Sequence, residues 1–153
     1  MYLDIRLMKV TEFDAWDAFT YATPGGSIFS TAEYLDVLCS CTGDSFSIAA
    51  IQHEGKFLGG IALYEIRGRW GTVISPRSLL AHNGFFYNVG ESKYPSRQES
   101  MARGQQQAIL ECVENSGYGS ICIKCRPDIR DVRTFLDRGW TVLPTYSYAV
   151  ELD

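Results

Sequence analysis

Hydrophobic residues alternate with polar ones along residues 2–10, which predicts a half-buried β-strand. A helical pattern follows, because three aromatic residues recur at the spacing of one helix face and Thr11 precedes them as a candidate N-cap. These aromatic residues are Phe13, Trp16 and Phe19. A second helix is predicted after residues 30–33, whose order Ser-Thr-Ala-Glu is the capping-box pattern.

The middle of the chain is rich in β-prone apolar residues. Residues 45–52 and 56–67 form two such runs, and the His-Glu-Gly sequence at 53–55 between them predicts a hairpin turn. Residues 70–75 predict a third consecutive strand. Residues 76–95 then lack clear periodicity over a stretch much longer than a usual connection, so we expect this loop to be functional and to form a wall of the main cleft.

The second half of the chain predicts two more helix-and-strand pairs. The capping-box pattern Ser-Arg-Gln-Glu at 96–99 predicts the start of a long helix that ends near Gly117. Residues 118–124 predict a strand, residues 129–138 a short helix, and residues 140–152 a last strand.

The resulting order, β-α-α-β-β-β-α-β-α-β, favours one α/β (α+β) domain over residues 1–153, since no repeat, linker or low-complexity segment divides it. Consecutive strands and interspersed helices predict a mixed, mostly antiparallel sheet with helices on both faces.

Three short stretches carry a resemblance to a known family. They are residues 27–35 (Ser-Ile-Phe-Ser-Thr-Ala-Glu-Tyr-Leu), residues 74–77 (Ile-Ser-Pro-Arg), and residues 135–140 together with 144–152. With the order of elements, they resemble the GNAT acyltransferase fold, and more particularly the N-terminal lobe of FemABX-like aminoacyltransferases and related two-lobed GNAT proteins. A second lobe follows in those relatives, whereas this sequence stops at Asp153, so the resemblance implies a lone lobe.

The glycine-rich loop that active GNAT enzymes use for acetyl-CoA is not present. Those enzymes carry Gln/Arg-x-x-Gly-x-Gly/Ala directly before the long helix, where backbone N–H groups bind the diphosphate. Here Arg-Gly-Gln-Gln-Gln-Ala at 103–108 has the right residue types in the wrong spacing, inside the predicted helix. The resemblance implies that the first lobe of the two-lobed family also does without acetyl-CoA. We therefore predict no cofactor.

Charge and cysteine content narrow the function classes. The net charge of -4 disfavours nucleic-acid binding through the field of the whole protein. The N-terminal sequence MYLDIRLMKV has neither a signal-peptide core nor a membrane span. Five scattered cysteines do not form a secreted disulfide framework, and Cys122 and Cys125 fall three apart in a predicted strand, on opposite faces. We expect a cytoplasmic protein without a metal site.

The long loop supplies the candidate catalytic residues. His82 and Tyr87 are the available groups for acid or base chemistry, and Asn83 beside them is a candidate ligand contact. No serine or cysteine nucleophile can be tied to His82 by spacing, so a histidine that caps a turn or contacts a ligand is the alternative.

Three arginines are candidate ligands for an anion. Arg77 lies near the start of the loop, and Arg97 and Arg103 lie on the helix after it, so the loop has the means to gather guanidinium groups. A solvated helix face explains Arg97 and Arg103 equally well.

Three functions remain open on the sequence alone. The first is a ligand-binding or vestigial acyltransferase-like module for a small molecule or peptide. The second is an active acyltransferase that transfers an acyl or aminoacyl group to an amine, with a donor other than acetyl-CoA or a site completed across a dimer. The third is an interaction protein that pairs through a sheet edge. Because residues 145–152 are β-prone and nearly uncharged, we expect a homodimer through this C-terminal strand.

Overall fold

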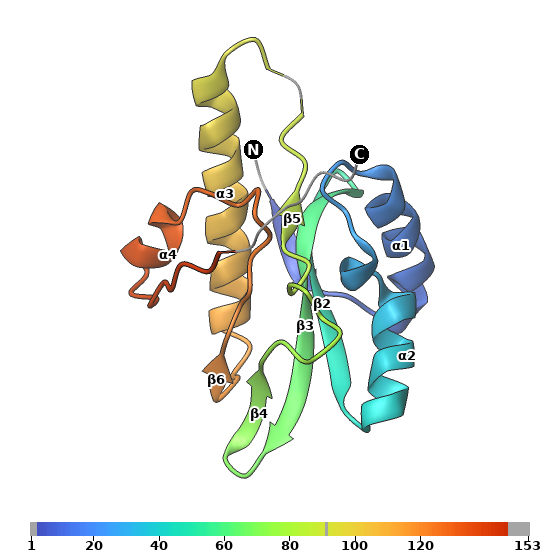
Figure 1. Ribbon diagram of the computed structural model, residues 1–153. Coiled ribbons are helices and arrows are strands. Elements are labelled where there is room, and N and C mark those ends of the chain that lie inside the picture. The colour runs from blue at the N-terminus through green and yellow to red at the C-terminus, as the bar shows by residue number, and fades with distance from the viewer. Residues whose placement is uncertain (1–2, 91, 147–153) are drawn as a thin grey trace, which may run out of the picture.

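The computed structural model describes residues 3–90 and 92–146, and a central sheet separates two helical layers (Figure 1). The strands are β1 (Asp4–Leu7), β2 (Ser45–His53), β3 (Lys56–Gly68), β4 (Gly71–Ile74), β5 (Phe86–Tyr87) and β6 (Ser120–Ile121). The helices are α1 (Phe13–Ala22), α2 (Ala32–Thr42), α3 (Pro95–Glu114) and α4 (Arg133–Asp137), with the 3-10 turns η1 (Val10–Glu12) and η2 (Ile28–Ser30). Helices α1 and α2 cover one face of the sheet, and α3 covers the other with α4 outside it.

The sheet is mixed and mostly antiparallel, as the sequence predicts. Its order is β1-β2-β3-β4-β6, and β5 pairs with β3 beside that path. Only the β4–β6 pair among these described strands is parallel. The predicted hairpin between β2 and β3 is confirmed, and both of its turn residues, Glu54 and Gly55, have positive φ angles of 50° and 76°. Two positive φ angles in succession match the twist of a tight hairpin.

The two central strands bury both of their faces. On β3, Ile61 and Leu63 belong to the hydrophobic cluster under α3, while Ala62 and Tyr64 belong to the cluster under α2. Strand β2 alternates in the same way, because residues one apart on a strand point to opposite faces. The helices on both faces therefore rest on one two-sided core.

Trp16 fixes α1 to the sheet. Its side chain is fully buried, and its indole N–H donates to the Ser30 carbonyl at 2.8 Å. A Cβ at Gly60 on β3 would lie 2.6 Å from the Trp16 ring and 2.4 Å from the Ala49 carbonyl oxygen. Only glycine lets the ring and the two strands approach so closely, so the helix face predicted from the aromatic spacing is buried at Trp16.

The helix starts differ from the capping patterns in the sequence. Thr31, rather than Ser30, caps α2 and accepts from the Tyr34 N–H at 3.3 Å. Helix α3 begins at Pro95, and its N-cap, Tyr94, lies two residues before the predicted cap Ser96. Proline occupies the first helical position well because its missing N–H has no partner there in any helix.

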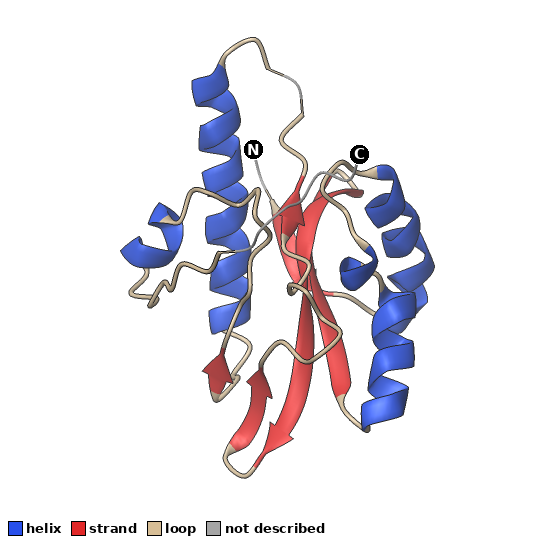
Figure 2. Cartoon of the chain, in the orientation of Figure 1, coloured by secondary structure: helices blue, strands red, loops and turns tan. Residues whose placement is uncertain are grey.

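The C-terminal part of the described chain contains less regular structure than the sequence predicts (Figure 2). The strand predicted over 118–124 is reduced to the two residues of β6, and the helix predicted over 129–138 to the five of α4. Residues 140–146 form no strand, and residues 147–153 lie outside the described residues. Among the described helices, none is long and apolar enough to cross a membrane.

Candidate functional site

The long loop is an interrupted strand. Before the interruption, the Ser75 N–H donates to the Tyr64 carbonyl at 3.3 Å; after it, the Asn83 carbonyl accepts from the Ala62 N–H at 3.1 Å. Strand β5 then continues the antiparallel pairing with β3. Residues 76–82 therefore leave the edge of the sheet after β4 and return to it before β5. We call these residues the excursion.

Asn83 connects the sheet to the chain that follows β6. Its N–H donates to the Lys124 carbonyl at 3.0 Å, and its side-chain Oδ1 accepts from the Lys124 N–H at 2.7 Å. Two residues before Lys124, the Cys122 N–H donates to the Ile74 carbonyl at 2.8 Å. Asn83 is buried, so these bonds hold the two chain segments together inside the protein.

His82 is a buried, neutral imidazole that caps a turn. Its Nδ1 accepts from the Gly84 N–H at 2.9 Å, so its proton resides on Nε2, which lies 3.3 Å from the Ser27 hydroxyl oxygen. Burial, and secondarily the charge of Arg126, lowers the pKa of His82 to about 4. The turn-capping alternative is confirmed by the Gly84 bond.

This geometry does not make Ser27 a nucleophile. Because Nε2 carries the proton, the imidazole donates to Ser27 rather than accepting a proton from it. The Ser27 oxygen also accepts from the Phe29 N–H at 3.1 Å. Gly84 fits the same docking, since its φ is +72° and a Cβ there would lie 2.5 Å from the Ser30 hydroxyl oxygen. His82 thus anchors the excursion against the α1–α2 connection.

Tyr87 bonds to a different element from His82. Its hydroxyl accepts from the Gln106 side-chain N–H on α3 at 3.3 Å, and burial raises its pKa. The same Gln106 nitrogen lies 3.4 Å from the Asp131 carbonyl, while the Gln106 Oε1 is buried without a partner among the described residues. The two predicted catalytic residues therefore serve separate contacts.

The structure does not gather the three predicted arginines. Arg77 pairs with Asp44 at 3.0 Å, beside the α2 face of the sheet. Arg97 and Arg103 both lie on α3, which covers the opposite face. Of the three, Arg103 alone lines the polar cavity between α3 and α4.

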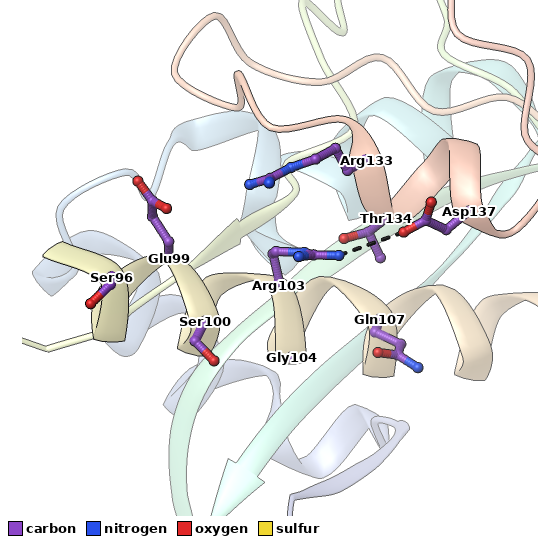
Figure 3. A pocket seen from close by; sticks show the side chains of 9 residues that line it. All are labelled: Ser96, Glu99, Ser100, Arg103, Gly104, Gln107, Arg133, Thr134 and Asp137. Atoms are coloured by element: carbon purple, nitrogen blue, oxygen red, sulfur yellow. Dashed lines mark ion pairs between the residues drawn. The ribbon is translucent and has the colours of Figure 1, made fainter.

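A polar cavity of about 540 Å³ lies between α3 and α4, and we call it the α3–α4 groove (Figure 3). Helix α3 contributes Ser96, Glu99, Ser100, Arg103, Gly104 and Gln107. Helix α4 contributes Arg133, Thr134 and Asp137. No residue between 76 and 95 lines it, so the cavity lies just beyond the loop that the sequence favours as its wall.

The groove mixes cations and carboxylates. Arg133 binds Asp131 through two nitrogen atoms at 2.9 and 2.7 Å, whereas Arg103 has one ion pair, to Asp137 at 3.5 Å. Figure 3 shows Arg103 reaching along α3 toward Asp137, with Thr134 beside it. Thr134 is 6% exposed, and its hydroxyl has no hydrogen-bond partner among the described residues.

A second cavity, of about 660 Å³, lies between α1 and α2 and is lined by several acidic side chains. Two of its carboxylates have structural partners. Asp17 accepts from the N–H groups of Ala32 and Glu33 at 2.6 and 2.9 Å and so stabilises the start of α2. Asp44 accepts from Tyr64 and Arg77, which lowers its pKa.

No protein-family model and no curated protein matches the chain. Solved structures do. The aminoglycoside N-acetyltransferase AAC(6')-Iy in complex with the bisubstrate analogue CoA-S-monomethyl-acetylneamine superposes with a TM-score of 0.52, over 100% of both chains, at 15% identity. The same enzyme in complex with CoA gives a TM-score of 0.50 over 98% of this chain and 100% of that one, at 14% identity.

The chain has a GNAT-like fold. At this identity, the likeness establishes the fold, which is the one predicted from the order of elements. In this GNAT-like fold, the polar cavity lies along the N-terminal turns of the long helix α3.

Of the nine residues that line the groove, the sequence predicts only Arg103 as a site residue. Arg133 and Asp137 belong to the helix predicted over 129–138, and in the structure Arg133 pairs with Asp131. The sequence gives no reason to select Thr134 between them. What distinguishes its hydroxyl, burial without a hydrogen-bond partner among the described residues, is visible only in the structure. The spacing of Arg133 and Asp137, four apart on a helix, is the one feature that places both on one face.

Proposed function

We propose that this chain is a GNAT-like lobe, related to the first lobe of FemABX-like aminoacyltransferases, which binds a small or peptidic ligand without a complete acetyl-CoA site. The pair of hydrogen bonds between Asn83 and Lys124 carries this proposal. A mixed sheet of this type offers a ligand the place where its strands separate. Here Asn83 lies at that place, and its hydrogen bonds to Lys124 join the chain before β5 to the chain after β6.

The start of α3 supports the same conclusion. The four residues before Ser96 are Ser92, Lys93, Tyr94 and Pro95, without a glycine among them. Pro95 has no N–H to offer a phosphate oxygen, and Tyr94 provides no side-chain cap. A diphosphate therefore has few of the backbone donors that such a site requires.

An active acyltransferase is the second candidate, since the fold is shared with acetyltransferases. It would need a donor other than acetyl-CoA or a second chain to complete the site. The neutral, hydrogen-bonded state of His82 and the separate environment of Tyr87 argue against their acting together as acid and base. We also place the protein in the cytoplasm, because all five of its cysteines are free thiols, which suits a reducing compartment.

Isothermal titration with acetyl-CoA tests the proposal. We expect a dissociation constant weaker than about 1 mM, because the helix start lacks the backbone donors for the diphosphate. Titration with aminoacyl and peptidoglycan-precursor ligands in the same buffer separates a binding module from an enzyme when product formation is followed by mass spectrometry. Tight acetyl-CoA binding, in the low micromolar range, would contradict the proposal.

A further inference from the structure

The α3–α4 groove contains hydrogen-bond donors without acceptors. Thr134 is buried and its hydroxyl is unpaired among the described residues, and leaving a buried polar group without a hydrogen bond is unfavourable. Arg103 is 44% exposed and meets Asp137 at 3.5 Å, an ion pair without a hydrogen bond among the described residues. Both groups line the same cavity, so a single acceptor placed between them would satisfy both.

The acceptor that suits these donors is a carboxylate. A guanidinium presents paired N–H groups that match the two oxygens of a carboxylate, and a threonine hydroxyl donates to either oxygen. A simple anion suits the groove less well, because Glu99 and Asp137 balance the charges of Arg103 and Arg133. A ligand with both signs of charge matches this lining.

Glu99 is the complementary group for a cation. It precedes Arg103 by four residues on α3, a rise of about 6 Å along the helix. Its carboxylate forms no hydrogen bond among the described residues, but it contributes to the raised pKa of Arg133, whose guanidinium extends toward Glu99 above Arg103 in Figure 3. Glu99 and Arg103 are therefore about one helical turn apart along α3. That separation suits a molecule whose ammonium and carboxylate are a few bonds apart.

We propose that the α3–α4 groove binds a short peptide with free termini, its carboxylate between Arg103 and Thr134 and its ammonium group toward Glu99. This inference rests on the proposed function and names the ligand class for it. The cavity, of about 540 Å³, falls within the usual range of 300–1,000 Å³ for small-molecule sites. Its hydroxyl, amide and charged lining suits a polar ligand of this kind.

Titration with the dipeptide Ala-Ala tests this inference on the full chain. We expect Ala-Ala to bind, and its C-terminal amide and its N-acetyl form to bind at least about tenfold more weakly, since each lacks one charge. Arg103→Gln and Thr134→Val are each expected to weaken Ala-Ala binding by about tenfold or more. Arg97→Gln is the matched control, because this arginine lies on the same helix outside the groove.

Two further variants distinguish binding from folding. Gly104 lines the groove, and a Cβ there would meet nothing within 4 Å, so Gly104→Leu fills the cavity while improving helix propensity. It should abolish binding with the melting temperature kept or raised. Thr134→Val should also keep or raise the melting temperature without peptide, because it removes an unpaired buried hydroxyl.

The outcomes separate the two proposals. No Ala-Ala binding, equal binding of the capped peptides, or unchanged binding in both Arg103→Gln and Gly104→Leu overturns the groove inference. Binding of inorganic phosphate without Ala-Ala overturns it too, in favour of a simple anion site. If acetyl-CoA also fails to bind in those cases, the proposed function stands, whereas low-micromolar acetyl-CoA binding overturns the proposed function whatever the peptide does.

Discussion

At the scale of single residues, His82 illustrates how burial changes a side chain's chemistry. The sequence offers it as an acid or base near neutral pH. In the fold it is 9% exposed and bonds through both ring nitrogens, to Gly84 and Ser27. The charges nearest to it come from Lys124, Arg126 and Asp128, and the two cations add to the effect of burial. A ring held neutral in this way stabilises the fold rather than exchanging protons.

The depressed pKa of His82 predicts a specific pH dependence of stability. In the unfolded chain the ring protonates near its ordinary value of 6.5, whereas in the folded chain it does so near 4. Between these values the unfolded state binds more protons, so the free energy of unfolding decreases as pH falls from 6.5 to 4. The loss should reach on the order of 3 kcal/mol at the low end.

His82→Asn isolates this contribution. Asparagine accepts from the N–H two residues later through its side-chain oxygen, as His82 does with Gly84, but it does not titrate. Urea unfolding of both proteins from pH 7 to pH 4 should show the smaller decrease in the variant. Carboxylates titrate in both proteins, so identical pH profiles would mean that His82 protonates normally in the fold.

Individual site residues were harder to predict than core residues. Trp16 is identified from helical spacing because burial follows from periodicity, which is a local property. Arg77 and Arg103 look alike in the sequence, yet they lie on opposite faces of the sheet. Their partners Asp44 and Asp137 are fixed by tertiary packing, on which spacing in the chain gives no information.

At the scale of elements, the strongly patterned segments were predictable and the short ones were not. The β2–β3 hairpin and helix α3 follow from long apolar patterns and a turn signal. Strand β5 has two residues, and its pairing with β3 depends on contacts with a segment about thirty positions away. Residues 76–95 therefore read as a loop, although they contain part of the sheet edge.

The Asn83 bridge predicts a coupling between the excursion and the chain after β6. Asn83→Ala removes the acceptor for the Lys124 N–H, a half-buried hydrogen bond whose loss costs on the order of 1 kcal/mol. Urea unfolding should report this loss. Hydrogen exchange of the Lys124 amide should accelerate more than that of amides on β2.

Asn88→Ala provides a control for this measurement. The Asn88 side chain accepts from the Gly90 N–H in an exposed turn, so its removal should change stability by less than about 0.5 kcal/mol. Equal effects of the two substitutions, or an unchanged Lys124 exchange rate in Asn83→Ala, would show that the bridge does not hold these segments together.

At the scale of the whole molecule, the order of elements was more informative than any motif. The GNAT-like fold follows from that order, and the superposition with AAC(6')-Iy agrees with it over the full chain. Ligand specificity does not follow from the fold, because the same scaffold supports different sites through its loops and helix faces.

The sequence also predicts a homodimer through the C-terminal strand, and two described residues close to that strand are relevant to it. Leu143 and Tyr146 are 80% and 88% exposed, so two large apolar side chains three residues apart are available for a contact. The β-prone run that they lead into continues through residues 147–153, outside the described residues. We expect this part of the chain to be covered by a second copy, as a symmetric dimer.

Light scattering at micromolar concentration should then report about twice the 17.2 kDa chain mass. Tyr146→Lys should shift the mass toward the monomer, because it places a charge in the apolar contact. Tyr21→Lys is the matched control, since Tyr21 is also a tyrosine, is 64% exposed and belongs to α1 rather than to the C-terminal segment. If the unmodified chain stays monomeric over this range, a contact through the C-terminal segment is ruled out. The same conclusion follows if it forms a dimer that Tyr146→Lys and Tyr21→Lys leave equally intact.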